Sequence, residues 1–229
     1  MAVLSAPFNA MTCMPVPPDL KTGFTVPAPL RERIERLLAS GERRLLGLAG
    51  APGSGKSTLA AALQDWLGAQ ACVVPMDGYH LANAELQRRG LAQRKGAPDT
   101  FDSAGYVALL RRLRQQQAGE IVYAPEFRRE IEEPVAGAIA VDPEIRLVIT
   151  EGNYLLLEQG HWNHVAPLLD EIWFLEVGPD LRRQRLQQRH ERFGRSPEQA
   201  LAWMEQTDEP NARLIEATRQ RAQRVWRLH

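Results

Sequence analysis

The sequence predicts a protein of the α/β class, with an open sheet of short buried strands connected by helices. Short apolar runs recur along the chain and alternate with segments of helical spacing. The first run, residues 45–49, leads into a glycine-rich turn and then into a helical pattern, which is the order of elements in an α/β unit. At 229 residues, with 44% apolar and 24% charged residues, the chain has the profile of one globular domain with insertions.

The chain before the first strand divides into a tail and a helix. Residues 1–28 contain five prolines and little periodicity, so we predict a tail that is disordered or laid across the surface. The main domain is then expected at residues 29–229. Leu30, Ile34 and Leu37 have helical spacing, which predicts a helix packed beside the first strand.

The glycine-rich turn after the first strand is the most informative stretch. It reads Gly50, Ala51, Pro52, Gly53, Ser54, Gly55, Lys56, Ser57, Thr58, which satisfies G-x-x-x-x-G-K-[ST]. The backbone N–H groups of such a turn form a concave nest, and the following helix N-terminus adds further donors. We therefore predict a nucleoside triphosphate site, in which Lys56 reaches the β- and γ-phosphates and the Ser57 hydroxyl binds Mg²⁺.

An acidic residue follows the second predicted strand. Residues 71–75 form an apolar run typical of a strand buried on both faces, and Met76, Asp77 and Gly78 come directly after it. Ligands of open α/β sheets bind outside the carboxyl ends of the strands. Asp77 is therefore placed to face the phosphate loop, and we prefer a catalytic role for it over an Asp-Gly turn that caps the next helix.

The segment 82–132 is polar and rich in turn residues. It contains one predicted helix, at about 103–117, with Asp102 or Ser103 as N-cap, and an extended piece at 121–130. We expect it to fold over an acceptor pocket. Its basic residues could bind an anionic substrate group, although a solvated loop explains each of them singly just as well. They are Arg88, Arg89, Arg94, Lys95, Arg128 and Arg129.

A second acidic residue ends the next predicted strand. The apolar run that begins at Ile145 is followed by Glu151 and Gly152. A carboxylate at this point can hold Mg²⁺ directly or through water, and we prefer that role over a structural one. Residues 171–177 predict a fourth strand, after a short helix or turn at 162–169, and residues 224–228 predict a final one.

An arginine-rich helix is predicted at residues 180–195. A solvated helix face is the usual explanation for so many charges. In a phosphoryl-transfer enzyme such a helix can also close over the nucleotide and place an arginine against developing charge. Arg185 and Arg189 lie one turn apart, so one helix face can present both.

Charge and cysteine content limit the partners. The 28 basic and 28 acidic residues balance, which gives no reason to expect a nucleic acid or a membrane. Cys13 and Cys72 lack metal-ligand spacing, and the apolar run around Cys72 favours a buried reduced thiol. No apolar run is long enough to span a membrane, and no secretory leader is recognisable. We therefore predict a cytoplasmic protein.

Three motifs together resemble a known family. They are the phosphate loop, Met76-Asp77-Gly78-Tyr79-His80, and Thr150-Glu151-Gly152-Asn153-Tyr154. With the arginine-rich helix they resemble the P-loop kinases that include uridine kinase, pantothenate kinase and phosphoribulokinase, in particular the bacterial branch labelled nucleoside/nucleotide kinase-like or fructose-transport-system kinase. The phosphate loop alone is generic, but the other two motifs in this order are much more specific. The resemblance runs from about residue 42 to residue 229.

This resemblance implies a P-loop NTPase fold, that is, a doubly wound parallel sheet with helices on both faces and an arginine-rich lid at about 180–200. It implies phosphate transfer from ATP, with Mg²⁺, to a hydroxyl of a small metabolite such as a sugar, a nucleoside or a pantothenate-like acid. It also suggests a homodimer.

The resemblance also implies roles for individual residues. Asp77 orients the acceptor hydroxyl, Lys56, Arg185 and Arg189 are the other catalytic residues, and Ser57 and Glu151 hold the metal. Tyr79, His80, Phe127 and Arg129 correspond to acceptor-pocket positions. Arg94 and Asn153 are further candidates for binding the acceptor, Arg94 because of its charge. In one departure, Arg128 stands where several relatives carry an acid, which leaves the identity of the acceptor more open.

Two other functions compete with a small-molecule kinase. A nucleotide-dependent switch or regulator would bind or hydrolyse the triphosphate without an acceptor. The sequence contains neither the N-K-x-D motif of guanine recognition nor the L-S-G-G-Q motif of transporter ATPases, and a switch has no need of Asp77 beside an enclosed pocket. A nucleic-acid end kinase would need a long basic groove with exposed aromatic residues, and the neutral charge balance argues against one.

Overall fold

A computed structural model describes residues 24–228. Its centre is a five-stranded parallel sheet with the strand order β2-β5-β1-β6-β7. The strands are β2 (Ala71–Val73), β5 (Leu147–Gly152), β1 (Arg44–Ala49), β6 (Glu171–Glu176) and β7 (Arg224–Arg227). The predicted α/β class is confirmed, and each predicted strand is present within one or two residues of its expected position.

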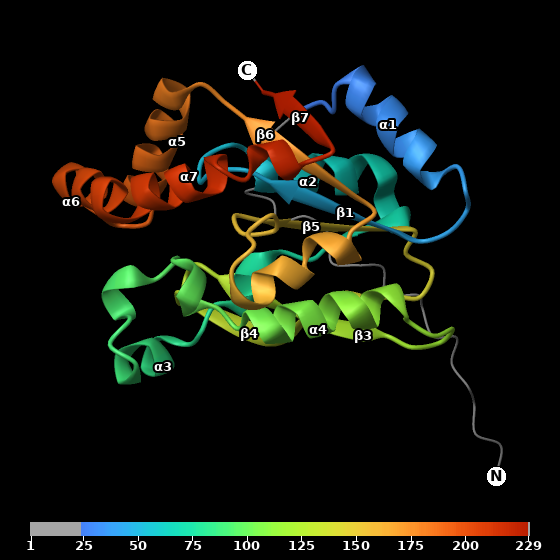
Figure 1. Cartoon of the computed structure of the whole chain (residues 1–229), viewed down its shortest axis with the longest axis horizontal. Helices are drawn as coiled ribbons and strands as arrows, with labels where there is room; N and C mark the ends of the chain where they lie inside the picture. The colour runs from blue at the N-terminus through green and yellow to red at the C-terminus, as the bar shows by residue number, and fades with distance from the viewer. Residues whose placement is uncertain (1–23, 229) are drawn as a thin grey trace, which may run out of the picture.

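Two hydrophobic cores cover the two faces of the sheet, and Figure 1 shows helices on either side of it. Helices α1 (Ala28–Leu38) and α2 (Lys56–Leu67) pack on one face. Helix α4 (Ser103–Arg114), capped by the Asp102 side chain as predicted, packs on the other. Successive side chains of β1 alternate between these cores: Leu46 and Leu48 join the first, while Leu45 and Ala49 join the second.

A two-stranded antiparallel hairpin lies beside α4, formed by β3 (Val122–Arg128) and β4 (Glu133–Val141). The extended piece predicted at 121–130 is the first strand of this hairpin. The second strand was not predicted, because its charged start and Pro134 are poor strand signals. The strand forms nevertheless, and Pro134 pairs with Phe127 near the turn.

A helical subassembly follows β6. It consists of α5 (Pro179–Arg192), α6 (Pro197–Trp203), a π-helical turn (Met204–Asp208) and α7 (Glu209–Glu216). Arg182 of α5, which is buried, donates from Nη2 to both carboxylate oxygens of Glu209 at 2.7 Å. Figure 1 shows α5 and α6 on the same side of the molecule as the short helix α3 (Asn83–Arg88), the side toward which β1 points.

Three other sequence expectations concern single features. The short helix or turn expected at 162–169 is a pair of 3-10 turns, Gly160–His164 and Ala166–Leu168. Cys72 is fully buried, but it is disulfide-bonded, so the expected reduced thiol is wrong; Cys13 lies outside the described residues, as does the tail to residue 23. Among residues 24–228, no helix is long and apolar enough to cross a membrane.

Candidate active site

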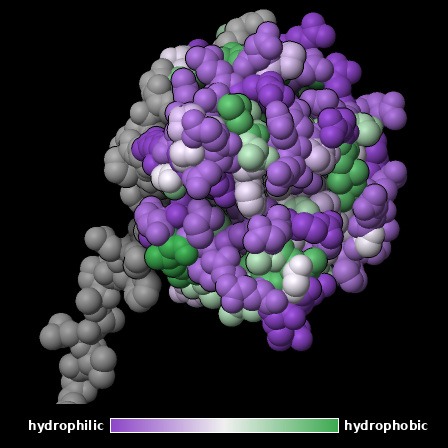
Figure 2. Space-filling view, turned by 90° about the vertical axis from the view of Figure 1, so that its left-hand side faces the viewer, coloured by the Kyte–Doolittle hydropathy of each residue, from purple (hydrophilic) through white to green (hydrophobic). Residues whose placement is uncertain are grey.

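The predicted catalytic residues meet at the carboxyl edge of the sheet. Ala49 pairs with Gly152, so the phosphate loop that begins at Gly50 lies beside Glu151. Val73 pairs with Ile149, and the chain beyond it enters a 3-10 turn, Met76–Tyr79, that carries Asp77. Figure 2 views the molecule from the side of α3 and α6, and hydrophilic residues cover most of this face.

The phosphate loop has the backbone that its glycines permit. Gly53 and Gly55 have φ values of 83° and 92°, which favour glycine. A Cβ on Gly53 would lie 2.9 Å from the Arg182 carbonyl oxygen, so α5 packs directly against the loop. The Lys56 ammonium donates to the carbonyls of Gly50 at 2.8 Å and Ala51 at 3.1 Å. Burial lowers the pKa of Lys56 to about 8, although Glu151 and Asp77 oppose the shift.

The two residues predicted to hold Mg²⁺ are in direct contact. The Ser57 hydroxyl donates to Glu151 Oε1 at 2.9 Å. Burial and the nearby charge of Asp77 raise the pKa of the Glu151 carboxyl, so the site would favour a cation beside it. No group of three or more His, Cys, Asp or Glu side chains suited to a metal occurs within residues 24–228. This donor set fits Mg²⁺, which is commonly held by one or two side chains together with substrate phosphates.

Asp77 lies near four basic side chains. Burial alone would raise the pKa of its carboxyl, but His80, Arg129, Lys56 and Arg189 together lower it below the ordinary value. Arg129 Nη2 lies 3.5 Å from Asp77 Oδ2, and the Asp77 side chain is 31% exposed. The pKa values of Asp77 and Glu151 are thus pushed in opposite directions, and Asp77 is the carboxylate that stays ionised most readily.

Two of the predicted arginines lie on different sides of the site. Arg185 faces the phosphate loop, since its Nη1 would be 3.7 Å from a Cβ on Gly55. Arg189 lies toward the carboxylates of Asp77, Glu151 and Asp208, whose charges act to raise its pKa. Burial and the charge of Arg129 outweigh them, so the pKa of Arg189 is lowered. The helix face predicted to present both arginines therefore extends from the phosphate loop toward Asp77.

Arg129 connects the hairpin to α5. Its guanidinium lies 5.8 Å from the ring centre of Phe127 on β3 and 5.9 Å from that of Phe193, which directly follows α5. Cation–π contacts of this kind orient the guanidinium. Phe193, which is 48% exposed, was not predicted as a site residue, because an exposed aromatic residue near a helix end carries no sequence signal of its own.

His80 and Tyr79 also lie in this region. His80 Nδ1 is 2.8 Å from the Asp77 backbone carbonyl, which can only accept, so this nitrogen carries the proton. The His80 ring is 4.0 Å from the Phe101 ring and 4.7 Å from the Phe127 ring, centre to centre. Tyr79 contacts Tyr106 of α4 at 5.4 Å.

The remaining acceptor candidates are partnered or peripheral. Arg94 is exposed and forms an ion pair with Asp99 at 3.0 Å. Lys95 donates to Asn83 Oδ1 at 2.7 Å and to the Glu132 carbonyl. Arg128 pairs with Glu126, and Asn153 is half-buried immediately after β5. Among the described basic residues predicted to bind the acceptor, Arg129 is therefore the one paired with Asp77.

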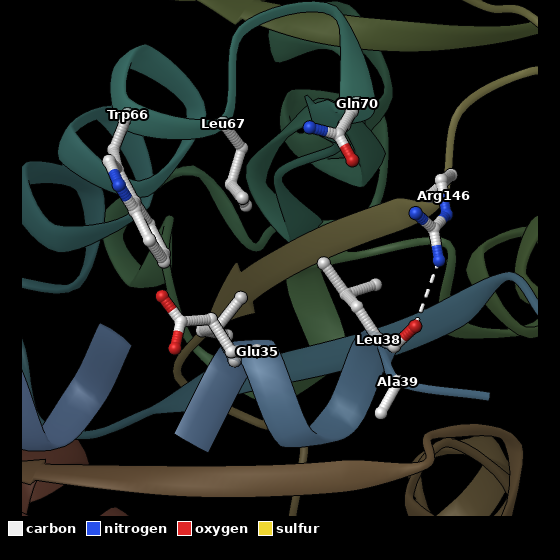
Figure 3. Close-up of a pocket in the computed structure, with 8 residues that line it drawn as sticks. Glu35, Leu38, Ala39, Trp66, Leu67, Gln70 and Arg146 are labelled. Carbon is white, nitrogen blue, oxygen red and sulfur yellow. Dashed lines mark hydrogen bonds between the residues drawn. The ribbon is translucent and has the colours of Figure 1, made fainter. Parts of the chain in front are cut away.

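A separate pocket of about 380 Å³ lies at the opposite edge of the sheet (Figure 3). Its walls include Leu38 of α1, Trp66 and Leu67 of α2, and Arg146, which precedes β5. Arg146 donates to the Leu38 carbonyl at 2.8 Å, the bond drawn in Figure 3. The phosphate loop and both candidate carboxylates lie at the carboxyl ends of the strands, so this pocket is separate from the predicted nucleotide site.

Gly78 gives a structural test of the turn that carries Asp77. A Cβ at this position would lie 2.7 Å from the Pro125 carbonyl carbon, and closer still to its oxygen. Because backbone atoms cannot move aside, we expect Gly78→Ala to cost about 1–3 kcal/mol of unfolding free energy and to reduce turnover. Gly178→Ala is the control, since its Cβ would meet no atom within 4 Å. Equal urea midpoints for the two variants would contradict this packing.

The fold and the phosphate loop define a P-loop nucleotide-binding protein with an acidic site beside the loop. No family model matches the chain. A provisionally named uridine kinase of Schizosaccharomyces pombe, C227.14, is 36% identical over 198 residues, which cover 82% of this chain and 84% of the relative. A pantothenate kinase of Limosilactobacillus reuteri is 31% identical over 60% of this chain and 46% of its own length.

A solved structure agrees with these relatives. The crystal structure of a provisional fructose transport system kinase from Silicibacter sp. TM1040 is 43% identical, with a TM-score of 0.78 over 87% of this chain and 97% of that one. The chain belongs to the P-loop kinases related to uridine kinase and pantothenate kinase. It is therefore a kinase, which uses ATP and acts on a small molecule.

Proposed function

We propose that this kinase transfers the γ-phosphate of ATP to a hydroxyl of a small metabolite, with Asp77 orienting that hydroxyl. The observation that supports this most directly is the convergence of the phosphate loop, Lys56, Glu151 and Asp77 at one edge of the sheet. Phosphoryl transfer depends mainly on positioning and on charge stabilisation. These residues supply both.

Each group has a distinct task in this proposal. The phosphate loop and Lys56 bind the phosphates, and Ser57 with Glu151 would hold Mg²⁺, which neutralises phosphate charge when bound. Arg185 and Arg189, in the proposed lid at about 180–200, stabilise charge on the transferred group. Asp77 accepts a hydrogen bond from the acceptor hydroxyl and aims its oxygen at the γ-phosphate, since its lowered pKa makes it a weak base but a well-placed acceptor.

The function is tested by measuring ADP release from Mg·ATP across nucleosides, pentoses, hexoses, sugar phosphates, pantothenate and glycerate. Asp77→Asn is the control. Strong stimulation by one compound, lost in the variant, would support the proposal and identify the acceptor. Slow hydrolysis that no compound stimulates and that the variant does not change would instead favour a nucleotide-dependent switch.

Arg129 favours an acceptor that carries an anionic group. Its guanidinium lies 5.8 Å and 5.9 Å from the ring centres of Phe127 and Phe193 and beside Asp77, where the reacting hydroxyl would bind. A carboxylate or phosphate of the acceptor could form charge-assisted hydrogen bonds with it. This favours a pantothenate-like acid, or a sugar that carries a phosphate group, over an uncharged sugar or nucleoside.

We expect Arg129→Gln to raise KM for an anionic acceptor by about 10–150-fold, because hydrogen bonds to charged groups contribute about 1.5–3 kcal/mol, while KM for ATP changes little. The measurement compares matched compounds: glycerate with glycerol, pantothenate with pantothenol, and ribose 5-phosphate with ribose. Arg128→Gln is the control, because Arg128 pairs with Glu126 instead. A wild-type preference for the neutral compounds, or equal behaviour of the two variants, would contradict an anionic acceptor.

A further inference from the structure

A buried hydrogen-bond chain lies directly behind the two candidate carboxylates. The last backbone bond between β5 and the chain after β2 runs from the Val74 N–H to the Ile149 carbonyl at 2.8 Å. The Thr150 hydroxyl then donates to the Val74 carbonyl at 2.7 Å. The Thr150 side chain thus adds one more hydrogen bond between β5 and the chain after β2. This bond forms where the chain leaves the sheet and continues toward Asp77.

The direction of the chain follows from the chemistry of its members. The Val74 carbonyl can only accept, so the single proton of the Thr150 hydroxyl is used there. The Tyr106 hydroxyl, 2.6 Å from Thr150 Oγ1, must therefore donate to it. Tyr106 and Thr150 are both 0% exposed. Solvent therefore cannot replace either bond, and a lost hydroxyl leaves a buried group without its partner.

The same tyrosine reaches the other flank of Asp77. The Tyr106 ring lies 5.4 Å from the Tyr79 ring, centre to centre. In addition, the N–H of Asp102, at the N-terminal end of α4, donates to the Tyr79 carbonyl at 2.8 Å. Val74 and Tyr79 therefore hold the Asp77 turn from both sides, while Thr150 immediately precedes Glu151.

We propose that Tyr106 and Thr150 are positioning residues, which fix the separation between the Asp77 carboxylate and the Mg²⁺-binding Glu151. This inference rests on the proposed function for the roles of those two carboxylates. Neither hydroxyl is offered to substrate, because both are buried and both are used within the chain. Their effect on catalysis is exerted through the placement of the turn.

The decisive variants are Thr150→Val, which keeps the shape but removes the hydroxyl, and Thr150→Ser, which keeps the hydroxyl. Tyr106→Phe removes only the hydrogen bond from Tyr106 to Thr150 and keeps the bond from Thr150 to the Val74 carbonyl. It serves as a milder second variant if Thr150→Val folds poorly. Hydrogen exchange followed by mass spectrometry reports on the Asp77 turn without any requirement for activity. Mg·ATP affinity and acceptor-stimulated turnover are measured on the same preparations.

We expect Thr150→Val to accelerate exchange in residues 74–81 by at least 10-fold, with exchange in the phosphate loop and Mg·ATP affinity within about 3-fold of wild type. Turnover is expected to fall by about 10–100-fold, the range for a misplaced catalytic group, and Thr150→Ser to restore it to within about 3-fold. In the Asp77→Asn background, Thr150→Val should cause no further loss.

Uniformly faster exchange across the whole sheet, or unchanged exchange in residues 74–81, would overturn the positioning role. So would equal turnover of Thr150→Val and wild type. Full activity of Asp77→Asn would instead overturn the proposed function. If no acceptor stimulates the wild-type protein, the exchange measurement alone decides whether the hydroxyl chain holds the turn.

Discussion

Asp77→Asn is expected to reduce acceptor phosphorylation by about 10²–10⁴-fold, the range for loss of a positioned acid–base group. The amide has nearly the same shape, but it carries no charge and accepts a hydrogen bond from the hydroxyl less strongly. Mg·ATP affinity should stay within a few fold of wild type, because the loop and Lys56 are unchanged. Single-turnover kinetics and isothermal titration with Mg·ATP separate the two quantities.

Asp65→Asn is the matched control for this variant. Asp65 is an exposed acid on α2, and its replacement should leave both transfer and binding unchanged. The role of Asp77 is wrong if Asp77→Asn turns over at near the wild-type rate. It is equally in question if Mg·ATP affinity collapses, because the carboxylate would then contribute to nucleotide binding rather than to the acceptor.

Lys56→Ala is expected to weaken both Mg·ATP binding and turnover. The ammonium is buried at the phosphate loop, and a charge-assisted hydrogen bond to a phosphate contributes about 1.5–3 kcal/mol, which corresponds to about 10–150-fold in affinity. Turnover should fall further, because charge that builds up on the transferred group loses its nearest cation. Lys56→Arg is the control, since it keeps the charge but not the compact shape.

The lowered pKa of Lys56 predicts a pH dependence of Mg·ATP binding in the wild-type protein that Lys56→Ala lacks. Because the group titrates near pH 8 in the free protein and phosphate favours its protonated form, Mg·ATP affinity should decline as the pH rises through about 8 and above. The Mg·ATP affinity of Lys56→Ala, measured across the same pH range, should not show this decline. A Lys56→Ala variant that binds Mg·ATP as tightly as wild type below about pH 8, where Lys56 is protonated, would contradict the phosphate site.

Much of this molecule is determined by local sequence. The phosphate loop, the strands of the parallel sheet and the acids at their carboxyl ends were predicted, because each rests on a short pattern: a glycine spacing that permits one loop shape, or an apolar run that must be buried. Asp77 and Glu151 could be placed together because parallel strands bring their carboxyl ends to one edge.

Tertiary structure decided which side chains meet there. Arg94 and Arg129 are equivalent as basic residues in a polar segment, yet the fold pairs Arg94 with Asp99 and Arg129 with Asp77. The bond between Tyr106 and Thr150 joins positions 44 residues apart, and the strand Glu133–Val141 forms only because its partner in the hairpin is available. Periodicity encodes which face of an element is buried, whereas the partner of a buried polar group depends on how the elements pack.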